Sequence, residues 1–232
     1  MLQEHGMCIS SRVILFLVLV VFTPFLCGKT SVIMNKNINK DDEGSFFKNV
    51  IANNALVEKI KSIKLIICDV DGALTDATIL VTEQGEFGRA FSIQDGHAFA
   101  PAMKSGLKIA IVSGKAHGST LARAKKLGIP EMLIIQGVSN KVEAFDRLVK
   151  EYQLQPNEIL VYGDDVLDAQ IKTERKECFF VCPANAVWYI KPCADLVLPL
   201  RGGTSAFRMV LDLWLYLNKK HFAQSLIECA LQ

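Results

Sequence analysis

Two aspartates separated by a single residue follow an apolar run in the stretch LIICDVDGALTD, residues 65–76. Asp69 and Asp71 come directly after four apolar residues that predict a buried strand. Carboxylates are rarely buried without a partner, and two neighbouring ones repel each other. Either a cation lies between these acids, or they sit in a solvent-exposed loop without chemical consequence.

Phosphoryl transfer is a reaction that needs such a pair of acids. Asp69 could attack phosphorus and form an aspartyl-phosphate. Asp71 could first protonate the leaving oxygen and then accept a proton from the incoming water. Carboxylate oxygens of Asp69 and Asp164, together with the backbone carbonyl of Asp71 or Val70, would hold Mg²⁺. The cation would also allow the clustered carboxylates to stay ionised.

Residues that could bind the transferred phosphate follow other apolar runs. Ser113 and Gly114 end the run KIAIVSG, and Lys141 follows Ser-Asn at the start of a helical pattern. A hydroxyl, backbone amides and an ammonium group around a phosphate stabilise the charge that develops there. Taken singly, a Ser-Gly turn or a lysine is an ordinary surface feature. A calcium loop is excluded as an interpretation of DVDG, because no glutamate stands at the twelfth position.

The elements that would position these residues alternate between strands and helices. Apolar runs rich in Ile and Val predict strands at 64–68, 108–113, 132–137, 158–165, 178–183 and 194–199. Helical patterns are found at 118–127, 140–152, 166–175, 184–190 and 204–217. Strands that are apolar on both faces predict a parallel sheet covered on both sides, a three-layer Rossmann-like α/β fold. The carboxyl ends of its strands would bring together Asp69, Ser113, Lys141 and Asp164.

A β-hairpin is predicted between the first two strands of that sheet. The alternating runs 77–82 and 87–93 flank the sequence EQGE, which places Gly85 in the turn. The intervals 76–108 and 113–141 are too short to hold a cap domain. The hairpin would therefore form a flap beside an otherwise uncapped sheet.

Three further helices are expected outside the alternating pattern. One follows Asp95–Gly96 and ends near Ser105, with Pro101 delaying its start. Residues 46–63 show the pattern of one amphipathic helix. The apolar tail at 221–232 predicts a short helix that docks on the body.

Composition limits the partners and the compartment. The 232 residues carry a formal net charge of +2 and no basic run, so nucleic-acid binding is not expected. Seven cysteines without a CxxC pair favour free thiols in a reducing compartment over a disulfide framework. We therefore expect a cytoplasmic protein.

The N-terminal segment offers an alternative location. Residues 13–27 form an apolar run that suits the core of a signal peptide better than a membrane span. Export or membrane anchoring through this run is one possibility, and an over-extended start, with Met34 opening the protein, is the other. The expected division is a hydrophobic segment at 1–33, a linker and helix at 34–63, a catalytic domain at 64–218 and a tail at 219–232.

Four motifs in a fixed order, DVDGALTD, IVSGK, SNK and GDDVLD, resemble those of the haloacid dehalogenase superfamily of aspartate-nucleophile phosphatases. With IQDG, GGTSAFR and the missing cap, residues 64–218 look like the capless 3-deoxy-D-manno-octulosonate 8-phosphate (KDO 8-P) phosphatases. The resemblance implies roles in nucleophilic attack, acid–base catalysis, phosphate binding and magnesium binding for Asp69, Asp71, Ser113, Lys141 and Asp164. It implies that Asp165 and Asp168 supply a second metal ligand or support the first.

The resemblance also implies a substrate and an assembly. Members of the family hydrolyse KDO 8-P to the free sugar acid and phosphate in lipopolysaccharide biosynthesis. The hairpins of four subunits pack together and a neighbour closes each site, so a homotetramer is expected. Asp71, Asp95 and Arg208 are the residues expected to contact the sugar-phosphate substrate.

The chain departs from the family pattern near the expected substrate. Gln94 stands where Arg or Lys usually precedes Asp-Gly, Lys115 replaces an arginine, and Thr204 stands where Arg or Gly is common. Groups that would meet a sugar carboxylate have thus lost charge. Arg89 or Arg208 could compensate for that loss.

Two alternatives to this function stay open, the first of them because of Gln94 and Thr204. One is a phosphatase for another small acidic sugar phosphate. The other is a non-catalytic oligomerisation module. The presence of Asp71 argues against the module, because a scaffold has no use for an acid–base group.

Overall fold

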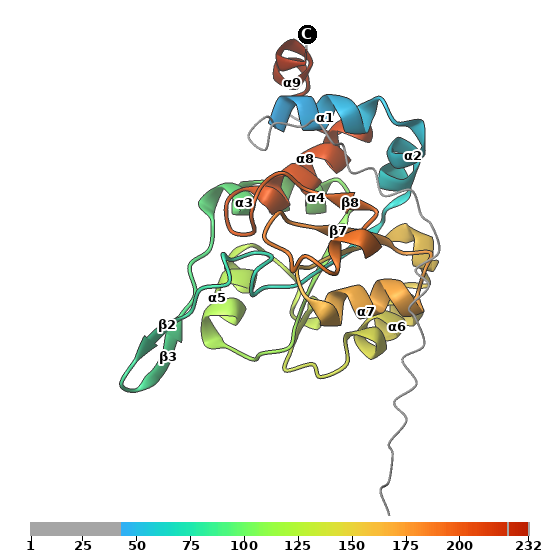
Figure 1. The fold of residues 1–232 in the computed structure, drawn as a ribbon. Coiled ribbons are helices and arrows are strands. Elements are labelled where there is room, and N and C mark those ends of the chain that lie inside the picture. The colour runs from blue at the N-terminus through green and yellow to red at the C-terminus, as the bar shows by residue number, and fades with distance from the viewer. Residues whose placement is uncertain (1–42, 222, 232) are drawn as a thin grey trace, which may run out of the picture.

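The computed structural model describes residues 43–221 and 223–231 of the chain (Figure 1). The hydrophobic segment predicted at 1–33 lies outside these residues, as does the linker up to residue 42. Within the described part of the chain, no helix is long and apolar enough to cross a membrane.

A sheet of six parallel strands forms the centre of the protein, in the order β5-β4-β1-β6-β7-β8. The strands are β1 (Leu65–Cys68), β4 (Lys108–Ser113), β5 (Ile134–Gln136), β6 (Ile159–Tyr162), β7 (Phe179–Cys182) and β8 (Leu196–Val197). Every residue of β1, β6 and β7 is buried, as expected of strands covered on both faces. The predicted α/β class is confirmed.

Helices cover both faces of this sheet and make a three-layer fold (Figure 1). α6 and α7 pack together on one face, whereas α8 packs against α2, α3 and α4 on the other. The helices are α1 (Glu43–Ile51), α2 (Asn54–Ser62), α3 (Ile93–His97), α4 (Phe99–Lys104), α5 (Gly118–Lys126), α6 (Lys141–Tyr152), α7 (Val166–Glu174), α8 (Ala206–Leu217) and α9 (Gln224–Ala230). The predicted tail helix is α9, and Ile227 within it and Leu231 directly after it pack against the core.

The predicted hairpin is the separate sheet of β2 (Leu80–Thr82) and β3 (Gly85–Gly88), which projects from the body (Figure 1). Gly85 follows the turn with a φ of +111°, a conformation that favours glycine. The strands are shorter than the alternating runs. Before β2, the φ of +69° at Ala77 departs from the extended conformation, and after β3, Arg89 is buried.

Residues 46–63 form two helices rather than the single helix that their pattern predicts. α1 ends at Ile51 and α2 begins at Asn54. Asn53 interrupts the run because its side chain accepts hydrogen bonds from the amides of Ala55 and Leu56. This is the geometry of a helix N-cap, which starts a new helix.

The helix expected after Asp95–Gly96 begins earlier and is divided. α3 starts at Ile93 and α4 follows it at Phe99. Pro101 lies in the first turn of α4, where the missing amide donor costs nothing.

The helix predicted at 184–190 is wrong, because this segment forms turns. Two of its amides bond to carbonyls in distant parts of the chain, and others close short turns, such as the bond from the amide of Ile190 to the carbonyl of Val187. The amide of Ala184 donates to the carbonyl of Leu200, and that of Val187 donates to the carbonyl of Asp164. Tertiary partners therefore replace the bonds that a helix would need.

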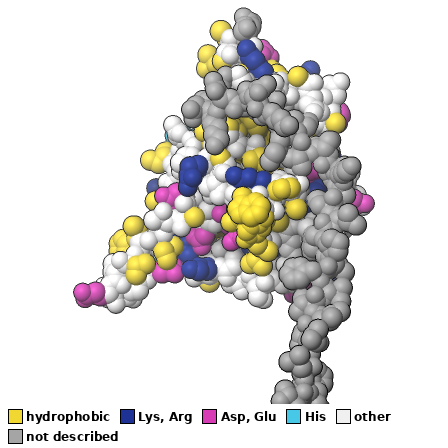
Figure 2. All heavy atoms as spheres, viewed as in Figure 1, with side chains coloured by type: hydrophobic (Ala, Val, Ile, Leu, Met, Phe, Trp, Pro, Cys, Tyr) yellow, Lys and Arg dark blue, Asp and Glu magenta, His cyan; other side chains and the backbone are white. Residues whose placement is uncertain are grey.

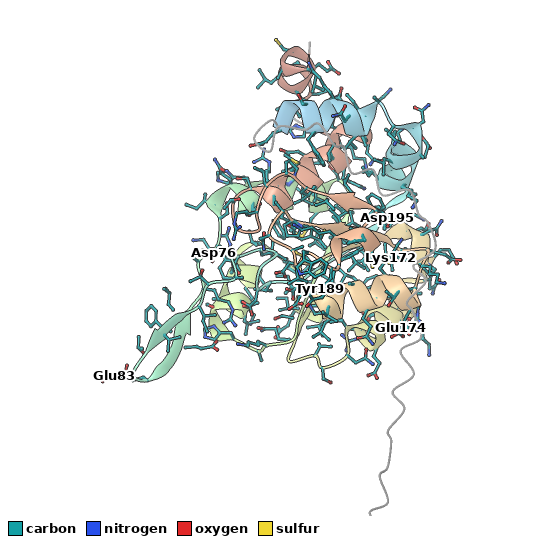
Figure 3. All side chains as sticks on the ribbon, in the orientation of Figure 1. Asp76, Glu83, Lys172, Glu174, Tyr189 and Asp195 are labelled. Carbon is teal, nitrogen blue, oxygen red and sulfur yellow. The ribbon has the colours of Figure 1, made fainter. Side chains whose placement is uncertain are left out.

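A buried ion pair ties α7 to the outer strands (Figure 3). Lys172 Nζ lies 2.7 Å from Asp195 Oδ2 and donates to the carbonyl of Cys178 at 2.6 Å. Asp195 also accepts hydrogen bonds from the amide of Phe180 at 2.8 Å and from Lys59 Nζ at 3.1 Å. Breaking a buried pair is costly, since it leaves a charge without its partner.

Replacing Lys172 with methionine should lower the free energy of unfolding by about 3 kcal/mol, because Asp195 then stays buried with a weaker set of partners. Urea denaturation measures the change. Lys61→Met is the matched control, since it removes an exposed pair with Glu58 and should cost less than about 0.5 kcal/mol. Equal losses in the two variants would contradict this account of the buried pair.

Candidate active site

The aspartates predicted to act together lie at the carboxyl ends of two adjacent strands. β1 and β6 pair in parallel, with Cys68 opposite Tyr162. The amide of Asp69 extends this pairing by donating to the carbonyl of Tyr162 at 2.9 Å, and Asp164 follows the end of β6. β4, the next strand of this sheet along the chain, lies on one side of β1, and β6, which comes later, lies on the other side. Ligands of open α/β sheets bind where the strand order reverses in this way.

Three buried carboxylates meet at this place. Oxygen atoms of Asp69, Asp164 and Asp168 lie within 4.8 Å of one another. Asp164 Oδ1 is buried and finds no hydrogen-bond partner among the described residues. Hard oxygen atoms at this spacing, one of them unpartnered, fit a divalent cation such as Mg²⁺. Asp165, the neighbouring acid, instead caps α7 by accepting a hydrogen bond from the amide of Val166 at 2.7 Å.

Lys141 places its ammonium group between two of these acids. Asn140 caps α6 with its side chain, so the helix begins with Lys141 at the sheet edge. Lys141 Nζ donates to Asp69 Oδ1 at 2.6 Å and to Asp168 Oδ1 at 2.7 Å. Burial lowers the pKa of Lys141, but the two carboxylates together outweigh it and raise the pKa above its usual value. Lys141 therefore stays protonated at neutral pH.

Burial is also the main influence on the pKa values of the clustered acids. It raises the pKa of Asp69 and Asp164, the latter to about 7, and the charge of Asp168 raises both further. The ammonium group of Lys141 offsets only part of this rise. A bound cation favours the ionised forms of such acids. The cluster is thus expected to release protons when it binds a metal ion.

Two glycines allow the acids to approach so closely. Gly72 has a φ of +93°, and a Cβ atom at this position would lie 1.9 Å from Asp164 Oδ2. A Cβ atom at Gly163 would lie 2.0 Å from Cγ of Asp168. Any other residue would push the carboxylate out of the cluster. The glycines of DVDG and GDD are therefore steric requirements of the site.

The side chain of Asp71 lies apart from the acidic cluster. Its carboxylate forms a two-pronged ion pair with Arg89, in which Nε donates to Oδ1 and Nη2 lies 3.0 Å from Oδ2. The third carboxylate of the cluster is that of Asp168, which the sequence suggests only as a second or supporting residue. The Asp71 side chain is 31% exposed, so a substrate can reach it.

Ser113 is the last residue of β4, the other neighbour of β1, and Gly114 follows it, as predicted. The Ser113 hydroxyl donates to the carbonyl of Lys115 at 3.0 Å, and the amide of Lys115 donates back to it at 3.3 Å. Gly114 has more room than Gly72 and Gly163, since a Cβ atom there would meet nothing closer than 3.6 Å. These two residues border the same sheet edge as Asp69.

Asp95 and Arg208, both expected to contact the substrate, contact each other. The amide of Arg208 donates to Asp95 Oδ1 at 2.8 Å, while its guanidinium donates to Asp212 at 2.7 Å. Asp95 thereby caps α8, whose N-cap residue Ser205 forms no side-chain cap of its own. Burial raises the pKa of Asp95, and the amides of Arg208, Ser205 and Phe207 lower it.

Asn185 supports the site, although the sequence analysis does not single it out. Its Nδ2 donates to the carbonyl of Gly72 at 2.7 Å, and its Oδ1 accepts from the amide of Gly202 at 2.6 Å. It therefore joins the loop after β1 to the glycine segment before α8. The only sequence clue is that an asparagine follows the end of a predicted strand.

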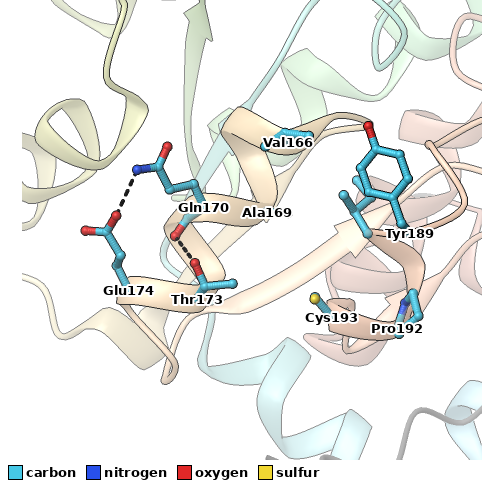
Figure 4. Close-up of a pocket in the computed structure, with 9 residues that line it drawn as sticks. Val166, Ala169, Gln170, Thr173, Glu174, Tyr189, Pro192 and Cys193 are labelled. Atoms are coloured by element: carbon cyan, nitrogen blue, oxygen red, sulfur yellow. Dashed lines mark hydrogen bonds between the residues drawn. The ribbon is translucent and has the colours of Figure 1, made fainter. Parts of the chain in front are cut away.

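A separate pocket of about 690 Å³ lies between α7 and the connection from β7 to β8 (Figure 4). Gln170 and Glu174 share a hydrogen bond of 2.9 Å along one wall, and Val166 and Tyr189 lie at the other end. None of the clustered acids lines this pocket. The candidate active site is the acidic sheet edge, because that is where the charged groups converge.

Relatives of the chain carry a common name. No protein family model matches the chain. The 3-deoxy-D-manno-octulosonate 8-phosphate phosphatase of Escherichia coli strain K12 is 34% identical over 165 residues, which cover 71% of this chain and 86% of that protein. The phosphatase of the same name from Yersinia pestis is 32% identical with the same coverage.

Solved structures agree with these relatives. The 3-deoxy-D-manno-octulosonate 8-phosphate phosphatase of Moraxella catarrhalis, in complex with a magnesium ion, a phosphate ion and a KDO molecule, has a TM-score of 0.67. It is 31% identical, and the match covers 77% of this chain and 99% of that one. A haloacid dehalogenase superfamily hydrolase of Legionella pneumophila has a TM-score of 0.69 at 30% identity, covering 79% and 97% of the two chains. This chain, with its acidic sheet edge, belongs to the 3-deoxy-D-manno-octulosonate 8-phosphate phosphatase family of the haloacid dehalogenase superfamily.

Proposed function

We propose that this chain is a magnesium-dependent phosphatase that hydrolyses 3-deoxy-D-manno-octulosonate 8-phosphate to the free sugar acid and phosphate in lipopolysaccharide biosynthesis. The observation that carries the proposal is the contact of Lys141 Nζ with Asp69, beside the unpartnered oxygen of Asp164. A nucleophile, a fixed positive charge and a cation-binding oxygen lie together at one sheet edge. These are the groups that phosphoryl transfer needs.

The reaction would proceed in two steps through an aspartyl-phosphate. An oxygen of Asp69 bonds to phosphorus while the bond from phosphorus to the sugar oxygen breaks. Protonated Asp71 gives its proton to that oxygen, so the sugar leaves as an alcohol. A water oxygen then bonds to phosphorus, its proton passes to Asp71, and the bond to Asp69 breaks. Inorganic phosphate leaves, and both aspartates return to their starting forms.

Asp69, Asp164 and the backbone carbonyl of Asp71 would hold the magnesium ion, with Asp165 or Asp168 as a second ligand or support. When bound, the ion supplies positive charge that offsets the repulsion between carboxylate and phosphate. The unpartnered oxygen of Asp164 supports this assignment. Asp168 already accepts a hydrogen bond from Lys141, which favours the supporting role for it.

Ser113, the amide of Gly114 and Lys141 would bind the phosphate oxygens. Lys141 is protonated and lies against the nucleophile, so it can stabilise the charge that develops at phosphorus. The Ser113 hydroxyl would turn from the carbonyl of Lys115 to the phosphate by rotation about its Cα–Cβ bond.

Another small acidic sugar phosphate is the second candidate substrate. Gln94 offers a neutral amide that hydrogen-bonds Ser205, and Arg208 would have to leave Asp212 to meet a sugar carboxylate. The Asp95 carboxylate already caps α8 by accepting a hydrogen bond from the amide of Arg208. Ranking kcat/KM over a panel of phosphorylated sugar acids separates the two candidates, and the 8-phosphate should rank first.

A homotetramer built through the hairpins is part of this proposal. Leu80, Val81 and Phe87 of the hairpin are 52%, 65% and 74% exposed, and apolar side chains are visible along it in Figure 2. A two-stranded ribbon with exposed apolar residues is marginal in water, so a partner should cover it. Light scattering should give the mass of four chains, and the mass of one chain would contradict the proposal.

We propose the cytoplasm as the location. The buried residues Cys68, Cys178 and Cys182 are free thiols, the state that a reducing compartment preserves. Export or anchoring through residues 13–27 is the alternative. Sequencing the N-terminus of the native protein separates them, because a cleaved leader would be absent.

Asp69→Asn should lower phosphate release from the 8-phosphate by on the order of 10⁴-fold or more, since an amide cannot act as the nucleophile. A malachite green assay under magnesium saturation measures the rate. The matched control is Asp146→Asn on the exposed face of α6, where activity should stay within about twofold. Activity that survives in Asp69→Asn would overturn the mechanism.

The affinity for Mg²⁺ should rise with pH. The pKa of Asp164 is raised to about 7, so below that pH a proton competes with the cation. The deprotonation of one carboxyl group with this pKa makes the affinity for Mg²⁺ about tenfold tighter at roughly pH 8 than at roughly pH 6. Calorimetric titration in two buffers of different ionisation enthalpy should also detect proton release. An affinity that does not vary with pH would contradict the raised pKa.

A further inference from the structure

We propose that Arg89 is a positioning residue, which holds the carboxylate of Asp71 toward the leaving group and links the hairpin to the acid–base step. This inference rests on the proposed function, because it assumes that Asp71 transfers the proton. It concerns a residue of the hairpin rather than of the sheet edge. The shape of the ion pair, its burial and its connection to β3 support this role.

The ion pair has the geometry that fixes a carboxylate in one orientation. Nε and Nη2 of Arg89 donate to the two different oxygens of Asp71. Two parallel hydrogen bonds from a planar guanidinium restrain both the position and the plane of the carboxylate. Among the described residues, Arg89 is the only one whose side chain hydrogen-bonds this carboxylate.

Burial shows which member of the pair is the anchor. The Arg89 side chain is 1% exposed, whereas the Asp71 side chain is 31% exposed. The guanidinium thus lies behind the carboxylate, and the substrate can approach the exposed side of Asp71. Holding an acid within reach of its target in this way speeds proton transfer.

The pair also ties the hairpin to the sheet edge. Arg89 directly follows β3, and its Nη2 lies 3.5 Å from Glu86 within that strand. Glu86 in turn lies 3.3 Å from Lys115, which follows Ser113 and Gly114. A change in the hairpin's position would therefore move the carboxylate of Asp71. Arg89 Nη1 is buried and has no hydrogen-bond partner among the described residues.

The test compares two esters that differ in their need for an acid. A sugar alkoxide must be protonated as it leaves, whereas nitrophenolate leaves without a proton. Loss of a well-placed general acid typically costs about 10²-fold or more. In Arg89→Met, the single-turnover rate of leaving-group release should therefore fall by about 10²-fold for the sugar phosphate. The fall should be less than about fivefold for nitrophenyl phosphate. Arg89→Lys should recover part of the loss.

Two further variants make the outcome unambiguous. Arg175→Met removes a similar two-pronged pair with Asp146 and should leave both rates unchanged. Asp71→Asn should show the same ester selectivity as Arg89→Met. If Asp71→Asn is selective but Arg89→Met lowers both rates equally, raises only KM or changes nothing, the positioning role of Arg89 is wrong. If Asp71→Asn itself lacks selectivity, the proposed acid–base function fails instead.

Discussion

The electrostatic cost of gathering carboxylates in a buried place is the constraint on which this structure depends. Asp69, Asp164 and Asp168 lie close together and away from water, and one ammonium group, that of Lys141, faces two of them. Burial favours the protonated acids, as the raised pKa of each shows. One lysine cannot neutralise three carboxylates. The site is therefore built to accept further positive charge, which a divalent cation supplies.

The fold meets this constraint through strand order and small residues. β1 lies between β4 and β6, so the ends of three strands converge at one edge of the sheet. Gly72 and Gly163 remove the Cβ atoms that would otherwise exclude two of the acids. Asn185 then joins the loop after β1 to Gly202, whose own Cβ would collide with the carbonyl of Gly72 at 2.0 Å. The acids are thus held in close-packed surroundings, from which the hairpin projects (Figure 1).

The sequence predicts the strands and the edge where they meet better than it predicts the contacts between side chains. The strand predicted at 108–113 matches β4 to the residue, because a run rich in Ile and Val favours a buried strand. The meeting of acids at one edge follows from the geometry of parallel strands. Asp71 and Arg89 are 18 positions apart in the sequence, and Asn185 and Gly72 are 113 positions apart. Contacts between such distant residues leave no periodic pattern in the sequence. The helix predicted at 184–190 is wrong for a related reason, since the amides of Ala184 and Val187 donate to distant carbonyls.

Diffraction from crystals grown with Mn²⁺, above the pKa of Asp164, tests the central claim most directly, because manganese scatters anomalously and replaces magnesium at oxygen sites. We expect one anomalous peak in contact with both Asp69 and Asp164, with Lys141 Nζ still beside Asp69. A peak away from these two carboxylates, or no peak under saturating metal, would contradict the view that a cation completes this cluster.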